Sequence, residues 1–131
     1  MTLTEFNALY DYKHDSKGRD MWRVLKPDDH CIFRGDCEDY SLSVLYYIVC
    51  KESWLKFWWL LFTFQAELCG CESKNGAHVV LRYGDQYIDN WSKAWVERKN
   101  MEELGHDFWP WHLTILPTTV AVKMVMAKLR G

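Results

Sequence analysis

The chain of 131 residues is long enough for one domain of ordinary size and too short for two domains with cores of their own. Hydrophobic residues make up 49% and charged residues 26%, a balance typical of a globular protein rather than a disordered one. Sixteen Lys and Arg against eighteen Asp and Glu give a formal charge of −2, which argues against a basic nucleic-acid-binding module. Aromatic residues reach 16% and include eight Trp, so we expect large rings in a small core or a groove lined with rings.

The five cysteines are an odd number, so at least one thiol is unpaired within a monomer. The first residues show no basic segment followed by an apolar run, so we predict no export signal and a cytoplasmic location. The most apolar run, residues 54–64, is shorter than the roughly 20 residues that span a bilayer. We therefore expect it to be buried core.

Apolar residues at helical spacing predict a short amphipathic helix over residues 2–12, with Thr4 as a candidate N-cap. Polar residues and a glycine predict a loop over 13–20, and residues 27–29 (PDD) are typical of a turn. Between these two segments, Trp22 begins a short apolar stretch that we expect to anchor the chain to the core.

The segment 41–50 (SLSVLYYIVC) carries apolar residues at intervals of three and one, which predicts a helix with one buried face. Three acidic residues, Asp36, Glu38 and Asp39, precede it, where the positive end of the helix dipole favours negative charge. This arrangement predicts that Cys37 lies in the first turn of a buried helix.

From Trp58 onward the pattern changes towards strands, because apolar and β-branched runs alternate with turn signals. The simplest arrangement is three antiparallel strands. The predicted strands are 60–64, 77–83 and 86–89, with turn signals at 74–76 and 84–85.

The last third of the chain gives weaker patterns. Residues 91–104 fit either a helix or a long loop, and 112–116 fit a further strand. For residues 118–130 both a helix capped by Thr118 and an alternating strand are open, and we favour the helix.

Three residues form a candidate catalytic constellation. A thiol attacks carbonyl groups as its thiolate, and a helix N-terminus stabilises that anion, so we expect a lowered pKa for Cys37. His78 opens one predicted strand and Asp89 ends the next, so the two can face each other as a base and its orienting acceptor. The alternatives are a buried apolar cysteine, an ordinary strand histidine and a turn aspartate, with Asn90 as a substitute acceptor.

The motifs around these residues resemble those of the bacterial transglutaminase-like cysteine proteinases, within the papain-like and transglutaminase-like fold. The resemblance rests on 35–40 (GDCEDY), 77–81 (AHVVL) and 87–90 (YIDN), with a similar lead-in at 20–22 (DMW). It covers roughly residues 20–90, and the cysteine motif is its most specific part.

The resemblance implies a fold and a set of roles. The expected fold is α+β, a papain-like/transglutaminase-like core with the catalytic helix packed on a small antiparallel β-sheet. Cys37 would be the nucleophile, His78 the general base and acid, and Asp89 the residue that holds the imidazole. The backbone N–H of Cys37 would be one oxyanion donor, and a side chain near Trp22 is our candidate for the second.

The resemblance also implies a candidate calcium site and a biological setting. In the exported, adhesin-cleaving branch of the family, acidic residues beside the cysteine help to bind calcium, and Asp36 and Glu38 occupy those positions. That branch is longer than this chain and exported. A small cytoplasmic version suggests a phage or mobile-element protein acting on a host target.

Two further groups of residues have both a functional and a structural interpretation. The C-x-C segment 69–71 could bind a metal with Cys31, His30 or His78, but no second pair follows it, so core or loop thiols are favoured.

The second group is aromatic. Trp109 and Trp111 lie near His106 and His112 and could form one wall of a substrate groove or pack around Pro110.

We therefore expect a single domain over residues 1–131 that acts as a cysteine hydrolase on amide bonds, most simply a peptidase with a protein or peptide substrate and no required cofactor. With an amine or a glutamine side chain as partner, the same site would be a transamidase or deamidase. The alternative classes are a binding or inhibitor protein on the same fold and a metal-dependent protein that uses the acidic cluster. No nucleic-acid partner and no transmembrane segment are expected.

Overall fold

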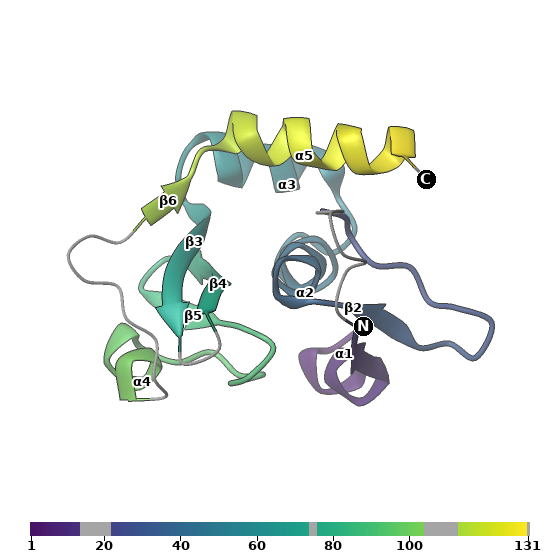
Figure 1. Ribbon diagram of the computed structural model, residues 1–131, viewed down its shortest axis with the longest axis horizontal. Coiled ribbons are helices and arrows are strands. Elements are labelled where there is room, and N and C mark those ends of the chain that lie inside the picture. Colours follow the sequence, from purple (N-terminus) through teal and green to yellow (C-terminus); the bar gives the residue numbers. More distant parts are fainter. Residues whose placement is uncertain (14–21, 74–75, 104–112, 131) are drawn as a thin grey trace.

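The computed structural model describes residues 1–13, 22–73, 76–103 and 113–130, which combine helices with two small sheets (Figure 1). The elements are α1 (Leu3–Leu9), β1 (Tyr10–Tyr12), β2 (Phe33–Gly35), α2 (Cys37–Val44), the π-helical turn η1 (Leu45–Val49), α3 (Trp54–Phe62), β3 (Ala66–Ser73), β4 (Gly76–Tyr83), β5 (Gln86–Ile88), α4 (Arg98–Glu103), β6 (Leu113–Ile115) and α5 (Pro117–Arg130). This mixture of helices and strands confirms the α+β class.

The larger sheet has four antiparallel strands in the order β5-β4-β3-β6. Its centre is the β3–β4 pair, whose register runs from Ala66 opposite Tyr83 to Ser73 opposite Gly76. Gly84 turns the chain into β5 with a φ of +61°, a conformation that glycine adopts without the strain a side chain would bring. His78 lies on β4 and Asp89 directly follows β5, so neighbouring strands of this sheet carry the two predicted residues.

Several predicted elements are confirmed here. The strands expected at 77–83 and 86–89 are β4 and β5, with Asp89 directly after β5, and the strand expected at 112–116 is β6. The favoured helix over 118–130 is α5, and the ambiguous segment 91–104 contains the short helix α4.

The first helix is shorter than predicted. Its N-cap is Thr2 and not Thr4: the Thr2 hydroxyl accepts the N–H of Glu5, whose carboxylate accepts the N–H of Thr2 in return. The chain leaves the helix at Tyr10, and β1 pairs in parallel with β2. This pairing joins segments more than twenty residues apart, so no local pattern could predict it.

The helix predicted after the cysteine is present as α2 and continues into η1, with Asp36 as its N-cap. Gly35 gives the chain a close approach before the helix. A Cβ atom there would lie 2.7 Å from Leu25 Cδ2 and 2.8 Å from Asp39 Cβ, so the entry into α2 has room only for glycine.

The prediction of a strand over 60–64 is wrong, because residues 60–62 are the end of α3 and residues 63–64 form the turn that follows it. The hydroxyl of Ser53 caps this helix by accepting the N–H of Lys56, and Phe57, Leu60 and Leu61 are buried at helical spacing.

The expectation that the whole run 54–64 is core is also wrong. The other side of α3 faces water, with Leu55 exposed by 85% and Trp59 by 63%. The strand that precedes β4 is instead β3, which contains the C-x-C segment in a strand and not in a loop.

Apolar side chains pack on both faces of the sheet. On one face, Leu68, Leu81 and Ile88 belong to the main core, which also contains residues of α2, α3 and α5. On the other face, a smaller cluster includes Val80 and Met101 of α4. Within the described part of the chain, no helix is long and apolar enough to cross a membrane.

Candidate active site

Cys37 is the first residue of α2, and its sulfur lies against strand β4. The thiol donates a hydrogen bond to Glu38 Oε2 at 3.2 Å and accepts one from the backbone N–H of Val79. Val79 directly follows His78 in the chain, so the helix N-terminus meets the sheet beside the predicted histidine. The N–H of Cys37, in the first turn of the helix, is a backbone donor of the kind that stabilises an oxyanion.

His78 and Asp89 are in direct contact. His78 Nε2 lies 2.7 Å from Asp89 Oδ2, and the two side chains are 6% and 0% exposed. The second carboxylate oxygen, Asp89 Oδ1, accepts the N–H groups of Trp91 at 3.2 Å and Ser92 at 2.7 Å. The loop after β5 therefore fixes the carboxylate, and the carboxylate fixes the imidazole.

The ring of Trp91 adds a second constraint on the imidazole. It stacks on His78 with the ring centroids 4.3 Å apart and the planes at 19°. Asp89, and not the alternative Asn90, is the residue in contact with His78. Nε2 faces Asp89, so Nδ1 is the ring nitrogen on the side away from that carboxylate.

The surroundings of the Cys37 thiol oppose its ionisation. Burial raises its pKa well above the ordinary value, and the negative charge of Glu38 raises it further, while the Val79 N–H has a smaller lowering effect. This is opposite to the lowered pKa expected from the helix N-terminus alone. The sequence indicated the helix dipole but could not indicate how little water reaches the thiol. Because the pKa is raised, the resting form is a neutral thiol.

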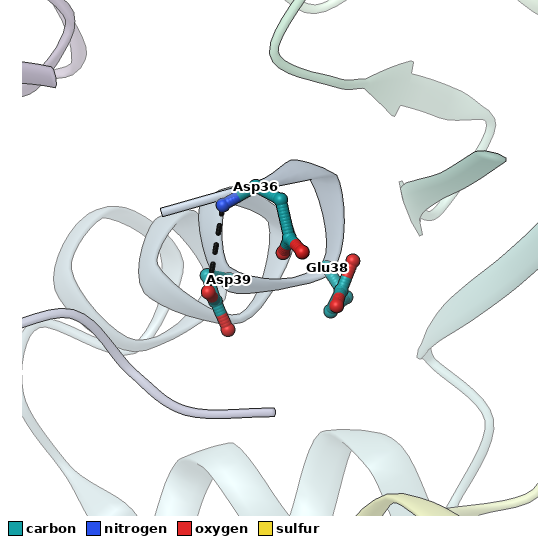
Figure 2. A group of neighbouring side chains, drawn as sticks. All are labelled: Asp36, Glu38 and Asp39. Atoms are coloured by element: carbon teal, nitrogen blue, oxygen red, sulfur yellow. Dashed lines mark hydrogen bonds between the residues drawn. The ribbon is translucent and has the colours of Figure 1, made fainter. Parts of the chain in front are cut away.

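Asp36, Glu38 and Asp39 form the acidic cluster, which is buried at the start of α2 (Figure 2). One carboxylate oxygen from each lies within 4.8 Å of the others. The Asp39 carboxylate accepts the N–H of Arg23 at 3.0 Å and that of Asp36 at 3.4 Å, so Asp39 serves the helix start. Burial raises the pKa of Glu38 to about 7, although hydrogen bonding to Asp36 and Cys37 lowers it by a smaller amount.

The fit of calcium to this cluster is partial. Carboxylate oxygens are the hard ligands that the ion prefers, so Asp36 and Glu38 have the right chemistry. Calcium takes about six to eight oxygen ligands, however, and three carboxylates supply fewer than that. A calcium ion would also compete with the proton that Glu38 binds near neutral pH.

A residue that the sequence did not single out, Asn7, connects the helix and the loop of the site. The Tyr40 hydroxyl of α2 donates to Asn7 Oδ1 at 2.6 Å, and Asn7 Nδ2 donates to the carbonyl of Lys93 at 2.7 Å. The N–H of Lys93 in turn donates to the carbonyl of Asp89 at 2.9 Å. Asn7 thus connects the helix of Cys37 to the loop of Asp89 through hydrogen bonds. No pattern in the sequence indicates this role for an asparagine on a short helix.

Trp22 belongs to the main core, as its apolar stretch predicted. It is buried, and Lys123 Nζ lies 5.1 Å from the centre of its ring. It lines a cavity of about 1270 Å³ whose described lining includes none of Cys37, His78 and Asp89. The next residue, Arg23, donates its backbone N–H to the Asp39 carboxylate, so this segment lies beside the first turn of α2.

The remaining predicted residues divide into two groups. Trp109 and Trp111, with His106 and His112, lie outside the described residues.

The second group is the cysteines, all five of which lie in described segments, where none forms a disulfide. Cys69 is buried in the smaller cluster, and Cys71 pairs with His78 in the strand register. Among the described residues, the acidic cluster is the only group of metal-ligating side chains close enough to share an ion, so the C-x-C metal interpretation has no support there.

Comparisons of the chain with protein-family models, curated proteins and solved structures gave no match, so the site is defined by its own geometry.

Proposed function

We propose that this protein is a cysteine hydrolase that cleaves amide bonds, most simply a peptidase, through Cys37, His78 and Asp89. The observation that carries the proposal is the buried contact between His78 and Asp89. His78 lies on β4, and the backbone N–H of the next residue, Val79, donates to the Cys37 sulfur. A nucleophile, a base and a group that orients the base are the three parts that thiol hydrolysis of a carbonyl compound needs.

The reaction would begin with His78 Nδ1 taking the thiol proton as the sulfur attacks the carbonyl carbon. The backbone N–H of Cys37 would donate to the resulting oxyanion, which stabilises the tetrahedral intermediate. His78 would then give its proton to the leaving amine, and a thioester would remain on Cys37. Water, activated by His78, would attack this thioester, release the carboxylic acid and regenerate the thiol.

The raised thiol pKa makes the base essential to this scheme. A neutral thiol is a weak nucleophile, so the attack depends on proton transfer to His78 at the moment of reaction. Asp89 stabilises the imidazolium ion that forms, which lowers the free energy of that step. The proposed chemistry needs no metal.

The acceptor of the acyl group decides the reaction type. Water gives hydrolysis, an amine gives transamidation, and a glutamine side chain as substrate gives deamidation by the same steps. We take hydrolysis of a protein or peptide as the leading case, in keeping with the resemblance to transglutaminase-like cysteine proteinases, and a phage or mobile-element role remains part of this hypothesis.

The test is the formation of an acyl-enzyme with p-nitrophenyl acetate, a probe that needs no knowledge of the substrate. We expect a burst of p-nitrophenol, with the acetyl group located on Cys37 by peptide mass spectrometry after acid quenching. Cys37→Ser and His78→Ala should abolish the burst. The matched control is Cys71→Ser, which removes a thiol opposite His78 in the strand register and should retain the burst. Equal acetylation of Cys31, which is exposed, would contradict the proposal.

A binding or inhibitor protein is the second candidate, favoured by the exposed rings of α3, since Trp59 is 63% exposed. The two candidates differ in their dependence on the thiol. A binding protein would bind its partner equally well as the wild type and as Cys37→Ser.

A further inference from the structure

Two helices on the side of the molecule away from the sheet hairpin expose an apolar surface. Helices α3 and α5 lie alongside each other, with α5 across the top of the view and α3 behind it (Figure 1). Their exposed apolar side chains define the α3–α5 face: Leu55, Trp59 and Phe62 of α3, with Val122, Val125, Met126 and Leu129 of α5. The exposure reaches 85% at Leu55 on α3 and 79% at Leu129 on α5.

The pattern along α5 shows that this exposure follows a helical face. Val120 and Ala127 point into the core, while Val122, Val125, Met126 and Leu129 recur at intervals of three, one and three on the water side. A helix that only covered the core would carry polar residues at these positions. Exposed apolar side chains that gather on one side of a helix in this way indicate an interaction site.

The charges of the α3–α5 face have one sign. Neither helix contains Asp or Glu, whereas Lys56 and Lys128 are both exposed on them. The chain as a whole has a formal charge of −2, whereas the exposed charges of the α3–α5 face are positive. This face therefore differs from the rest of the chain in the sign of its charge as well as in its exposed apolar side chains.

A basic cavity adjoins the same edge. Trp54 at the start of α3 and Lys128 near the end of α5 both line the cavity of about 1270 Å³. Arg23 and Lys26 add positive charge to its wall, and Glu52 is the one carboxylate of the described lining besides Asp28, whose partner is Arg34. The cations therefore outnumber the carboxylates where the cavity meets the helices.

We propose that the α3–α5 face docks on the surface of a bilayer that contains anionic phospholipid. Exposed Trp, Leu, Phe and Val side chains would enter the boundary of headgroups and acyl chains, and the lysines would meet the phosphate and carboxylate groups. A second copy of this chain fits less well, because a symmetric contact would bring together two faces whose exposed charges are both positive.

The docking surface is separate from the catalytic residues. None of the seven apolar residues of the α3–α5 face, nor Lys56 or Lys128, belongs to the contacts of Cys37, His78 and Asp89 described above. Membrane binding and acyl transfer to p-nitrophenyl acetate can therefore be measured independently, and the docking proposal does not depend on the proposed function.

The experiment is co-sedimentation with vesicles of phosphatidylcholine alone or with about 30 mol% phosphatidylserine. The protein should partition onto the anionic vesicles and be released by salt, with little binding to the neutral ones. Removing one lysine by Lys56→Gln or Lys128→Gln should weaken binding about fivefold. The double variant Val125→Ser/Leu129→Ser should weaken it tenfold or more, on the order of the loss of two buried apolar side chains.

Matched controls come from exposed positions elsewhere. Lys99→Gln on α4 removes a charge and Tyr12→Ser on β1 removes an exposed ring, and both should bind as the wild type does. Circular dichroism reports whether each variant is folded, and the single lysine variants test the proposal if the double variant is not. Absence of binding to anionic vesicles overturns the proposal. So does binding that neither kind of variant weakens, or a dimer that Val125→Ser/Leu129→Ser dissociates without any vesicle binding by the wild type.

Discussion

The start of α2 and the α3–α5 face depart from the usual distribution of residues in opposite ways. At the start of α2, three carboxylates are buried among protein groups beside a half-buried thiol. On the α3–α5 face, leucine, tryptophan and valine side chains are exposed to water. Burial of charge and exposure of apolar surface both oppose stability, so each needs a reason beyond folding. One small chain therefore carries two candidate sites, and each is marked by residues whose burial or exposure opposes stability.

The largest expected effect is on the buried side of this comparison, through Asp89. Asp89→Asn keeps the shape but removes the charge that stabilises a protonated His78, so the rate of acetylation of Cys37 should fall by roughly 10³- to 10⁴-fold. Stopped-flow measurement of the p-nitrophenol burst checks this. Asp85→Asn, at the exposed turn before β5, is the control and should react at the wild-type rate. A burst of normal rate in Asp89→Asn would remove the functional meaning of the His78–Asp89 contact.

The two sides of α3 offer a direct contrast in stability. Phe57 is fully buried, so Phe57→Ala should lower the free energy of unfolding by about 3–5 kcal/mol. Leu55, four-fifths exposed on the same helix, should lose less than about 0.5 kcal/mol as Leu55→Ala. Urea unfolding measures both. A comparable loss in the two variants would mean that the outer side of α3 is covered in the isolated protein.

The link between α1 and the site gives an effect of intermediate size. Asn7→Ala removes hydrogen bonds to both Tyr40 and Lys93 and should lower the free energy of unfolding by about 1–3 kcal/mol. It should also slow the acetylation of Cys37, because the Asp89 loop loses its connection to α2. Asn7→Asp retains an acceptor for Tyr40 but not the donor to Lys93, so its acetylation rate should be intermediate. Equal rates in all three proteins would limit Asn7 to a role in stability.

The acidic cluster predicts a pH dependence with a definite sign. Because burial raises the pKa of Glu38 from its usual value of 4.5 to about 7, the folded protein binds this proton more tightly than the unfolded one. Its contribution to stability is therefore complete below pH 4.5 and is lost as the pH rises through 7. Glu38→Gln should be more stable than the wild type by about 2–3 kcal/mol at pH 8 and equal to it near pH 4.

The same variant probes the Cys37 thiol. Without the negative charge of Glu38, alkylation of Cys37 by iodoacetamide should begin at a lower pH than in the wild type. Urea titrations at the two pH values and peptide mass spectrometry are the measurements. A wild-type alkylation profile in Glu38→Gln would show that burial alone sets the thiol pKa.

Calcium gives the smallest expected effect. At pH 8, where Glu38 has lost its proton, millimolar calcium should raise the Tm by a few degrees at most, and at pH 5 it should have no effect. Glu38→Gln should be insensitive at both pH values. A large stabilisation at pH 5 would mean that the cluster binds the ion with ligands beyond its three carboxylates.

Local patterns in the sequence predicted the parts of the site that are local in the chain. The spacing of apolar residues after Cys37 gave α2, and the turn at Gly84 with its flanking β-branched residues gave β4 and β5. His78 and Asp89 followed from that hairpin, because register places neighbouring strand ends together.

The features that the sequence did not predict depend on distant contacts or on burial. The apolar run of α3 satisfies helix and strand patterns alike, and only its packing against the core decides between them. The pairing of Tyr10 with Phe33 and the bridge made by Asn7 are non-local. The thiol pKa of Cys37 depends on how much water reaches it, which no spacing of residues reports.

The glycine before the cysteine has a consequence for mutational tolerance. Every substitution of Gly35 places a Cβ within 2.8 Å of Leu25 and Asp39, so the helix that carries Cys37 would have to move. In a saturation scan, neither Gly35 nor Cys37 would tolerate substitution, but the amount of folded protein and the activity would distinguish the two positions. Gly35 variants would be lost as folded protein, whereas Cys37→Ser would accumulate normally and lose only chemistry. Under the proposed function, the motif around the cysteine contains two neighbouring constraints of different origin, one on shape and one on reactivity.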